Sequence, residues 1–381
     1  MIMKRKYLKK ICASVVVGVL LLTGCGKEPE SNPTVNENAL SQEERINYME
    51  EKFEVPFERT SFELDYITED SIGLLTNPDG TVEWYTISRS VKEKYRDQAK
   101  DYIKQEKTFE KEWLEYRIWR FTFDEEKQWD REEVEKDRGL ADESLQYAGA
   151  KVFYGADNYL YLVLRYEKEL EDGRTEHTLG LFGLKDGTWS KVMDVSYQDG
   201  EEDLSFPVSY YVNSANHFLV AQTDGAIRSY LMSTGEEADI SSDFKFDVSN
   251  VIFKDGMGYS LDEDNNQVVV FDDETLVEEY KISIPEKLSE GGNRFEAGRD
   301  DTLLIYNKAG IFVSQLKEEK FTKVSSADIF NSVSIDHLAI REMAVVNKDE
   351  FYVSMYETDS EDLELKFSHC KGVNTDNKEQ N

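Results

Sequence analysis

Short apolar runs separated by polar turns dominate the chain from about residue 140 to 370. Apolar runs of four to eight residues bounded by turn residues are typical of β-strands. Asp-Gly occurs six times, and several of these dipeptides separate two apolar runs, as in LKDGTW and VIFKDGMGYSL. Because Asp-Gly suits the positive φ angles of tight hairpin turns, the pattern predicts a series of antiparallel hairpins.

These hairpins recur as a loose repeat of five units. Each unit has an apolar strand, a polar turn, a second apolar strand and then one or two more polar strands. The first strands of the units are expected to end near Tyr154, Val212, Phe253, Glu296 and Val346. Successive ends are then 58, 41, 43 and 50 residues apart. A period of roughly 40–50 residues is that of a four-stranded propeller blade.

The repeat resembles the irregular β-propellers of bacterial extracytoplasmic lipoproteins. That resemblance implies a mainly β fold, a β-propeller of about six or seven blades with one or two N-terminal helices. Residues 57–88 and 109–123 can supply another blade or two, and residues 62–68 can close the ring against the last blade. A β-sandwich or a β-solenoid is the alternative architecture.

Two helices are expected at the start of the folded body. The first follows a capping box at Ser41–Glu44 and carries apolar residues at helical spacing at Ile46, Met49 and Phe53. The second covers residues 90–106, with one face formed by Val91, Tyr95, Ala99, Tyr102 and Ile103. An alternative is that residues 41–108 form a small domain of their own.

The first 25 residues have the parts of a secretory signal peptide. A basic head is followed by an apolar run of about 12 residues, shorter than the roughly 20 that a membrane-spanning helix needs. The run ends on Leu22, Thr23, Gly24 and Cys25. These four residues resemble the lipobox of prokaryotic membrane lipoproteins, in which the cysteine is lipidated and becomes the first residue after cleavage.

The lipobox implies an anchor in the cell membrane through lipid, such as palmitate, on Cys25, with the protein on the extracytoplasmic side. Two acyl chains suffice for stable anchoring. Residues after Cys25 are polar and rich in proline and asparagine, which is typical of a tether. The expected segments are a signal peptide (1–24), a flexible tether (25–40), an N-terminal helix-containing segment that can form part of the propeller (41–139), propeller repeats (140–370) and a disordered tail (371–381).

The chain is strongly acidic, with a formal net charge of −33. The signal peptide holds five basic residues and no acidic one, so its removal leaves a net charge of −38. Nucleic-acid binding depends on neutralising phosphates with basic residues, so this composition excludes nucleic acid as a partner. It favours solubility and the attraction of cations.

Candidate chemistry is sparse. After cleavage and lipidation Cys370 stands alone, which excludes an internal disulfide and makes a structural role the simplest one for this thiol. The four histidines lack metal-ligand spacing, and no nucleophile elbow or phosphate-binding loop occurs. We therefore expect no cofactor.

A weak metal candidate lies in the stretch LDEDNNQVVVFDD, where Asp262, Asp264 and Asn266 occupy alternate positions. This resembles the start of a calcium loop, but the sixth position is Gln267 instead of glycine and the twelfth is Asp273 instead of glutamate. The alternative is a hairpin turn rich in Asp and Asn.

Three functions fit these observations. The first is a lipid-anchored, non-enzymatic propeller that binds an unknown ligand or protein partner. The second is an extracytoplasmic glycosidase or lyase that uses carboxylates in the channel, which a raised carboxyl pKa at the axis would favour. The third is a solute-binding lipoprotein of an uptake system, a class whose fold needs strands alternating with helices.

Overall fold

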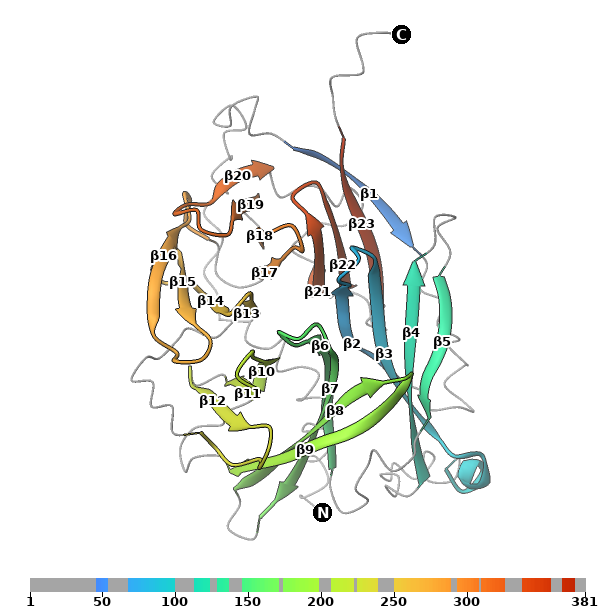
Figure 1. Ribbon diagram of the computed structural model, residues 1–381. Helices are drawn as coiled ribbons and strands as arrows, with labels where there is room; N and C mark the ends of the chain where they lie inside the picture. The colour runs from blue at the N-terminus through green and yellow to red at the C-terminus, as the bar shows by residue number, and fades with distance from the viewer. Residues whose placement is uncertain are drawn as a thin grey trace, which may run out of the picture.

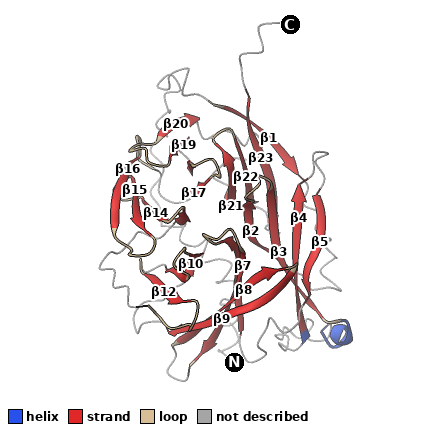
Figure 2. Ribbon diagram, viewed as in Figure 1, coloured by secondary structure: helices blue, strands red, loops and turns tan. Residues whose placement is uncertain are grey.

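The computed structural model describes residues 46–53, 68–99, 113–123, 129–136, 146–170, 174–198, 207–222, 225–238, 250–288, 293–307, 310–325, 338–357 and 365–373. Their strands form six antiparallel sheets around a common centre (Figure 1). Strands dominate the described residues (Figure 2). The fold is thus a six-bladed β-propeller, as the repeat predicted. None of the helices in the described ranges is long and apolar enough to cross a membrane.

Each blade is a sheet of strands that follow one another in the chain, with one exception. Blade 1 contains β2 (Thr68–Thr76), β3 (Val82–Val91), β4 (Leu114–Phe123) and β5 (Trp129–Lys136). Blade 2 contains β6 (Gln146–Tyr154), β7 (Leu160–Glu169), β8 (Thr175–Lys185) and β9 (Thr188–Gln198). Blade 3 contains β10 (Pro207–Val212), β11 (His217–Gln222) and β12 (Ile227–Leu231).

The other three blades complete the ring. Blade 4 contains β13 (Val251–Lys254), β14 (Met257–Asp262), β15 (Gln267–Asp272) and β16 (Glu278–Ser283). Blade 5 contains β17 (Arg294–Ala297), β18 (Thr302–Asn307), β19 (Gly310–Gln315) and β20 (Thr322–Ser325). Blade 6 contains β21 (Leu338–Asn347), β22 (Glu350–Glu357), β23 (Leu365–Val373) and, as the exception, β1 (Asn47–Phe53).

The innermost strands β2, β6, β10, β13, β17 and β21 contact one another in ring order and surround the axis (Figure 1). Their ends lie together: Thr76 Oγ1 donates a hydrogen bond to the Val345 carbonyl, 2.9 Å away, near the ends of β2 and β21. We call this the turn end of the ring, because each innermost strand there turns into the second strand of its own blade. The opposite end, where the chain enters the innermost strands, is the linker end.

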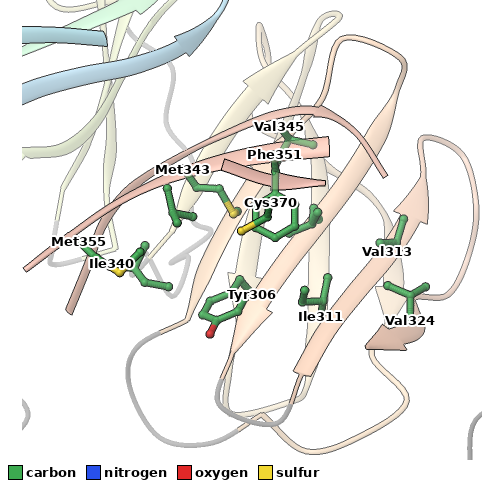
Figure 3. Packing of buried hydrophobic residues seen from close by; sticks show 12 residues of the cluster. Tyr306, Ile311, Val313, Val324, Ile340, Met343, Val345, Phe351, Met355 and Cys370 are labelled. Carbon is green, nitrogen blue, oxygen red and sulfur yellow. The ribbon is translucent and has the colours of Figure 1, made fainter. Parts of the chain in front are cut away.

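The hydrophobic core is divided among the six interfaces between neighbouring blades, with one apolar cluster in each. Figure 3 shows the cluster between blades 5 and 6, where Tyr306 and Ile311 of one blade pack against Phe351 and Cys370 of the other. Each sheet therefore buries both of its faces, as propeller geometry requires.

Double burial explains why many strands are apolar at every position instead of at alternate ones. Neighbouring residues on a strand point to opposite faces. Leu162 on β7 accordingly packs in the cluster between blades 1 and 2, and Val163 in the cluster between blades 2 and 3. Because both faces of a strand meet another blade, both residues are fully buried.

Ring closure joins the two ends of the folded chain. β1 pairs antiparallel with β23 in unbroken register from Asn47 opposite Val373 to Phe53 opposite Phe367. The last three strands of the chain thus receive their outermost partner from the beginning of the fold. The sequence pattern correctly expected an N-terminal segment to close the ring against the last blade. The closing strand, however, is β1 and not residues 62–68. Thr68 begins β2, and residues 62–67 lie outside the described residues.

The helix expected after Ser41 is wrong, because Asn47–Phe53 is the strand β1. Ile46 and Tyr48 pack against the cluster between blades 5 and 6, whereas Met49 is 55% exposed. The face is therefore defined by every second residue, and the helical spacing of Ile46 and Met49 is coincidental. Ser41–Glu44 lies outside the described residues.

The second expected helix starts later than residue 90. Residues 90 and 91 end β3, and a 3₁₀ turn, η2 (Glu93–Tyr95), leads into helical residues 96–99. The predicted apolar face forms as far as it is described: Val91 and Ala99 are buried, and Tyr95 stacks on Trp113 with 5.5 Å between ring centroids. Residues 100–106 lie outside the described part of the chain.

Two segment boundaries change. Residues 68–136 supply all of blade 1, and β1 belongs to blade 6, so the described residues of 41–139 are part of the propeller and not a separate small domain. Lys371–Val373, expected to belong to a tail, are instead part of β23 and pair with β1, and residues 374–381 lie outside the described residues.

The repeat positions and turns agree with the sequence pattern. The innermost strands of blades 2 and 3 end at Tyr154 and Val212, as predicted, and those of blades 4 to 6 end one residue later than predicted. Asp186-Gly187 and Asp255-Gly256 have positive φ at both residues, as a tight hairpin turn requires.

Closure by β1 makes a prediction for stability. Tyr48 packs edge-on against Phe351, with 5.3 Å between ring centroids, and its hydroxyl donates to the Lys348 carbonyl at 2.6 Å. We expect Tyr48→Ala to lower the free energy of unfolding by about 2–4 kcal/mol, because a large packed side chain is lost. Tyr48→Phe, which removes only the hydroxyl, is expected to cost about 1 kcal/mol.

Met49→Ala is the matched control, since Met49 lies next to Tyr48 on β1 and faces solvent. Its effect in urea unfolding should stay within about 0.5 kcal/mol. Equal losses from Tyr48→Ala and Met49→Ala would contradict the placement of β1 as the closing strand.

Candidate functional site

A charged cluster lies on the propeller axis, formed by Ser71, Lys151, Glu296 and Glu342. We call these residues the axial cluster. Lys151 comes from β6 in blade 2 and Glu342 from β21 in blade 6, with blade 1 between them. Lys151 Nζ nevertheless lies 2.5 Å from Glu342 Oε1, so this ion pair spans the inner edge of blade 1.

Blade 1 fills the space between these two residues. Ser71 on β2 donates its hydroxyl to Glu342 Oε2 and accepts a hydrogen bond from Trp84 Nε1 at 2.7 Å. Trp84 is fully buried on β3 and packs against Phe121, with 5.0 Å between ring centroids. The Glu342 carboxylate is thus held by two blades and supported by a rigid indole.

β-bulges help to aim these side chains. β2 carries an extra residue between Ser71 and Gly73, and β21 carries one between Ile340 and Glu342. A bulge bends a strand and redirects the neighbouring side chains. Ser71 and Glu342 each adjoin such a bulge, which places both side chains on the same point near the axis.

Glu342 is held as a carboxylate. Burial alone would raise its pKa, but attraction to Lys151 and the hydrogen bonds from Lys151 and Ser71 outweigh burial, so its pKa lies below the ordinary value. The side chain of Glu342 is only 6% exposed, whereas that of Lys151 is 39% exposed. The ion pair is therefore accessible to solvent from the lysine side.

The carboxyl group of Glu296, on β17 in blade 5, instead holds its proton more tightly than an ordinary glutamate. Burial raises its pKa to about 7, and the nearby Glu342 carboxylate adds to the rise. The backbone N–H of Ala297 donates to Glu296 Oε1 at 3.1 Å, and the nearby Lys151 and Arg299 also favour the charged form. The axis thus holds one ionised carboxylate and one that exchanges its proton near neutral pH.

Arg299 closes the axis at the turn end. It belongs to the turn after β17 in blade 5, and blade 2 lies on the opposite side of the ring. Its Nε donates to the Thr76 carbonyl of blade 1 at 2.9 Å, and its guanidinium lies 5.1 Å from the ring centroid of Tyr154 in blade 2. One side chain therefore connects three blades across the axis.

The weak metal candidates lie elsewhere, in the hairpin between β14 and β15. Asp262 accepts hydrogen bonds from the Asn265 backbone and side-chain amides and from Gln267. Asn266 has positive φ and hydrogen-bonds Ile284 and Leu288 of its own blade. Both side chains stabilise the turn, and within the described ranges no group of three His, Cys, Asp or Glu residues is placed to hold a metal.

The remaining sequence candidates are outside the axis or outside the described residues. Leu22, Thr23, Gly24 and Cys25 lie outside them. Cys370 is buried as a free thiol between blades 5 and 6. His369 Nε2 lies 2.9 Å from Glu350 Oε1 within blade 6, so neighbouring residues on β23 serve different contacts.

The sequence pattern did not single out the axial cluster. Its signal is a charged residue within the first, otherwise apolar strand of a repeat, as in YAGAKVFY around Lys151, RFEAG around Glu296 and AIREMAVV around Glu342. Only the ring brings these three strands together.

Glu296 generates a pH prediction. Its pKa is raised from 4.5 to about 7 in the folded protein, so the folded state holds a proton that the unfolded state releases between these values. The contribution of Glu296 to stability is therefore present below about pH 4.5 and is lost as pH rises to about 7. Relative to Glu296→Gln, wild type should lose on the order of 1–3 kcal/mol between pH 5 and 8.

Comparing wild type with Glu296→Gln cancels the contributions that other titrating groups make to the pH dependence of stability. These groups include the buried Asp273 carboxyl, whose pKa is raised to about 6 by burial. Glu236→Gln, at an exposed position, should leave the pH profile of unfolding unchanged. Parallel profiles for wild type and Glu296→Gln would show that Glu296 is ionised throughout this range and would contradict the assignment.

Comparisons with known proteins find distant structural similarities. No protein-family model and no curated protein matches the chain. The crystal structure of Kluyvelomyces marxianus Hsv2 is similar with 9% identity and a TM-score of 0.40, covering 77% of this chain and 78% of that chain. A protein of unknown function from Bacteroides caccae has 11% identity and a TM-score of 0.37, covering 69% of this chain and 84% of that chain. KlHsv2 with loop 6CD replaced by a Gly-Ser linker has 12% identity and a TM-score of 0.40, covering 76% and 77%.

Proposed function

We propose that the protein is a lipid-anchored, extracytoplasmic β-propeller that binds a ligand or protein partner at its axis. The observation that carries this proposal is the axial cluster. Lys151 and Glu342 form an ion pair that joins blades 2 and 6, and 39% of the Lys151 side chain is exposed. Charged groups on innermost strands, open to solvent on one side, are suited to recognising a polar ligand.

Stability alone is a poor explanation for this cluster. Removing two charges from water costs several kcal/mol per ion, and apolar residues of similar volume are often equally or more stable. Many residues of the innermost strands follow an apolar rule, and Leu74 and Val152 are only 4% and 0% exposed. The charges at Lys151, Glu296 and Glu342 depart from this rule at the place where propellers present a common surface.

The proposed anchor is compatible with binding at the axis. The segment from Cys25 enters the ring at β1, the outermost strand of blade 6. Anchoring through that strand leaves the axis free. The acidic net charge of the chain also disfavours contact between the body and anionic lipid.

Thermal unfolding of the purified chain tests the proposal. The panel contains calcium, oligosaccharides, cell-wall fragments and short cationic peptides. A ligand at about 100 times its dissociation constant adds roughly 2.7 kcal/mol, which raises the midpoint of a domain this size by several degrees. We expect Lys151→Met to abolish the shift and Lys185→Met, at an exposed position at the end of β8, to retain it.

Two results would contradict binding at the axis. One is a ligand whose shift is the same in Lys151→Met as in wild type. The other is a panel without any shift, combined with the absence of crosslinked adducts in cells when a photoreactive residue replaces Lys151.

A carboxylate-dependent glycosidase or lyase is the second candidate, favoured by one observation. Glu296 and Glu342 lie near one axis, and their environments raise the pKa of the first and lower that of the second. Such a divergence is what a general acid and a stabilising carboxylate require. A saccharide that shifts the midpoint should then be cleaved by wild type, with product formation falling as pH rises through about 7, and Glu296→Gln should bind it without cleavage.

The third candidate, a solute-binding lipoprotein of an uptake system, gains no supporting observation. That class needs strands alternating with helices. The described residues form antiparallel sheets in a single ring.

The anchor yields a separate prediction. Cells fed labelled palmitate should incorporate it into the wild-type chain, which should sediment with membranes. Cys25→Ser should lose both the label and the membrane association, because the lipidated thiol is absent. Cys12→Ser, in the apolar run before the lipobox, is the control and should behave as wild type. Label retained in Cys25→Ser would contradict the anchor.

A further inference from the structure

The innermost strands are less acidic than the chain as a whole. The chain has 78 acidic and 45 basic residues. At the innermost-strand positions whose side chains the structure describes, acidic residues are the minority, Glu296 and Glu342. Basic residues there are Lys151, Lys254, Arg294 and Arg341. Over their full sequences, with Glu69 and Asp70 on β2 included, the six innermost strands hold four acidic and four basic residues, so these strands are balanced in charge within an acidic chain.

Two of the four basic residues are already neutralised. Lys151 pairs with Glu342, and Lys254 Nζ lies 3.1 Å from Asp301 Oδ1. The other two, Arg294 and Arg341, have no carboxylate within ion-pair distance among the described residues. We call them the arginine pair.

Arg294 is fixed in place without losing its charge. It is the first residue of β17, so it lies at the linker end of the axis. Its Nε donates to the Ile340 carbonyl at 2.8 Å, and its Nη1 donates to the Asn293 carbonyl at 3.0 Å. Backbone carbonyls orient the guanidinium, and Glu342 and Glu263 favour its positive charge only from a distance beyond that of an ion pair.

Arg341 follows Ile340 directly, so the backbone contact of Arg294 places the two arginines side by side on neighbouring innermost strands. Arg341 is the extra residue of the β21 bulge, it has no partner on β22, and its side chain is exposed. Burial lowers the pKa of Arg294, and repulsion by Arg341 lowers it further, while Glu342 and Glu263 act in the opposite direction.

We infer that the arginine pair is a binding site for a small anionic ligand that carries a carboxylate or a phosphate group. Guanidinium forks bind such groups through two parallel N–H···O bonds. One arginine is preorganised by the backbone, and the other is free to close on the ligand. An anion bound between the two guanidinium groups also offsets the repulsion between their positive charges. This inference rests on the proposed function, since it names the ligand class for the same axis.

Thermal unfolding of the purified chain at constant ionic strength tests the site. The probes are inorganic phosphate and succinate, with sodium chloride as the reference. At about 100 times its dissociation constant, the matching anion should raise the midpoint by roughly 3–5 °C over chloride. A shift with phosphate alone assigns a phosphate-bearing ligand, and a shift with succinate alone assigns a carboxylate.

Arg341→Ala is the diagnostic variant, because substitutions at exposed positions usually change stability little. It should lose most of the anion-induced shift. Without anion its midpoint should stay close to that of wild type, since the lost repulsion of Arg294 is offset by the lost attraction to Glu342. Arg341→Lys should retain part of the shift, and Lys185→Ala, which removes an exposed charge away from the axis, should retain all of it.

Equal shifts in wild type and Arg341→Ala, or no shift beyond chloride with either anion, would overturn the inference. Failure of the arginine pair as an anion site can be distinguished from failure of the broader proposal of binding at the axis. A neutral oligosaccharide whose shift is lost in Lys151→Met would preserve binding at the axis while the arginine pair is excluded as an anion site.

Discussion

The pairing of β1 with β23 is the constraint on which the rest of the structure depends. It joins Asn47–Phe53 to Leu365–Val373, almost the full length of the folded chain apart. Without it blades 1 and 6 would meet only through side chains, and β23 would expose an unpaired edge. With it, six similar interfaces share the core, and each blade is held by two neighbours.

Closure also creates the axis. The axial cluster needs blades 1, 2, 5 and 6 at fixed positions, because Ser71, Lys151, Glu296 and Glu342 come from four different sheets. Arg299 connects blades 1, 2 and 5 at the turn end, and the arginine pair lies at the linker end. The axis is thus lined by charged residues, whereas the rest of the ring is held together by apolar contacts. We place ligand recognition at these charged residues.

Local pattern predicted the blades well because their rules are local. Asp-Gly turns and apolar runs set the hairpins, and the repeat placed the ends of β6 and β10 without error. The local pattern failed where a segment far away in the sequence determines the secondary structure. Ile46, Met49 and Phe53 fit a helix, but β23 draws this segment into a strand. The axial cluster was missed for the same reason: Lys151 and Glu342 are 191 residues apart, and no local rule links them.

A crystal structure of the chain grown in inorganic phosphate tests the central claim, recognition at the axis, most directly. We expect tetrahedral density between the guanidinium groups of Arg294 and Arg341, with the Lys151–Glu342 pair intact beside it. Phosphate bound only elsewhere, or both guanidiniums paired with carboxylates of the protein, would contradict it.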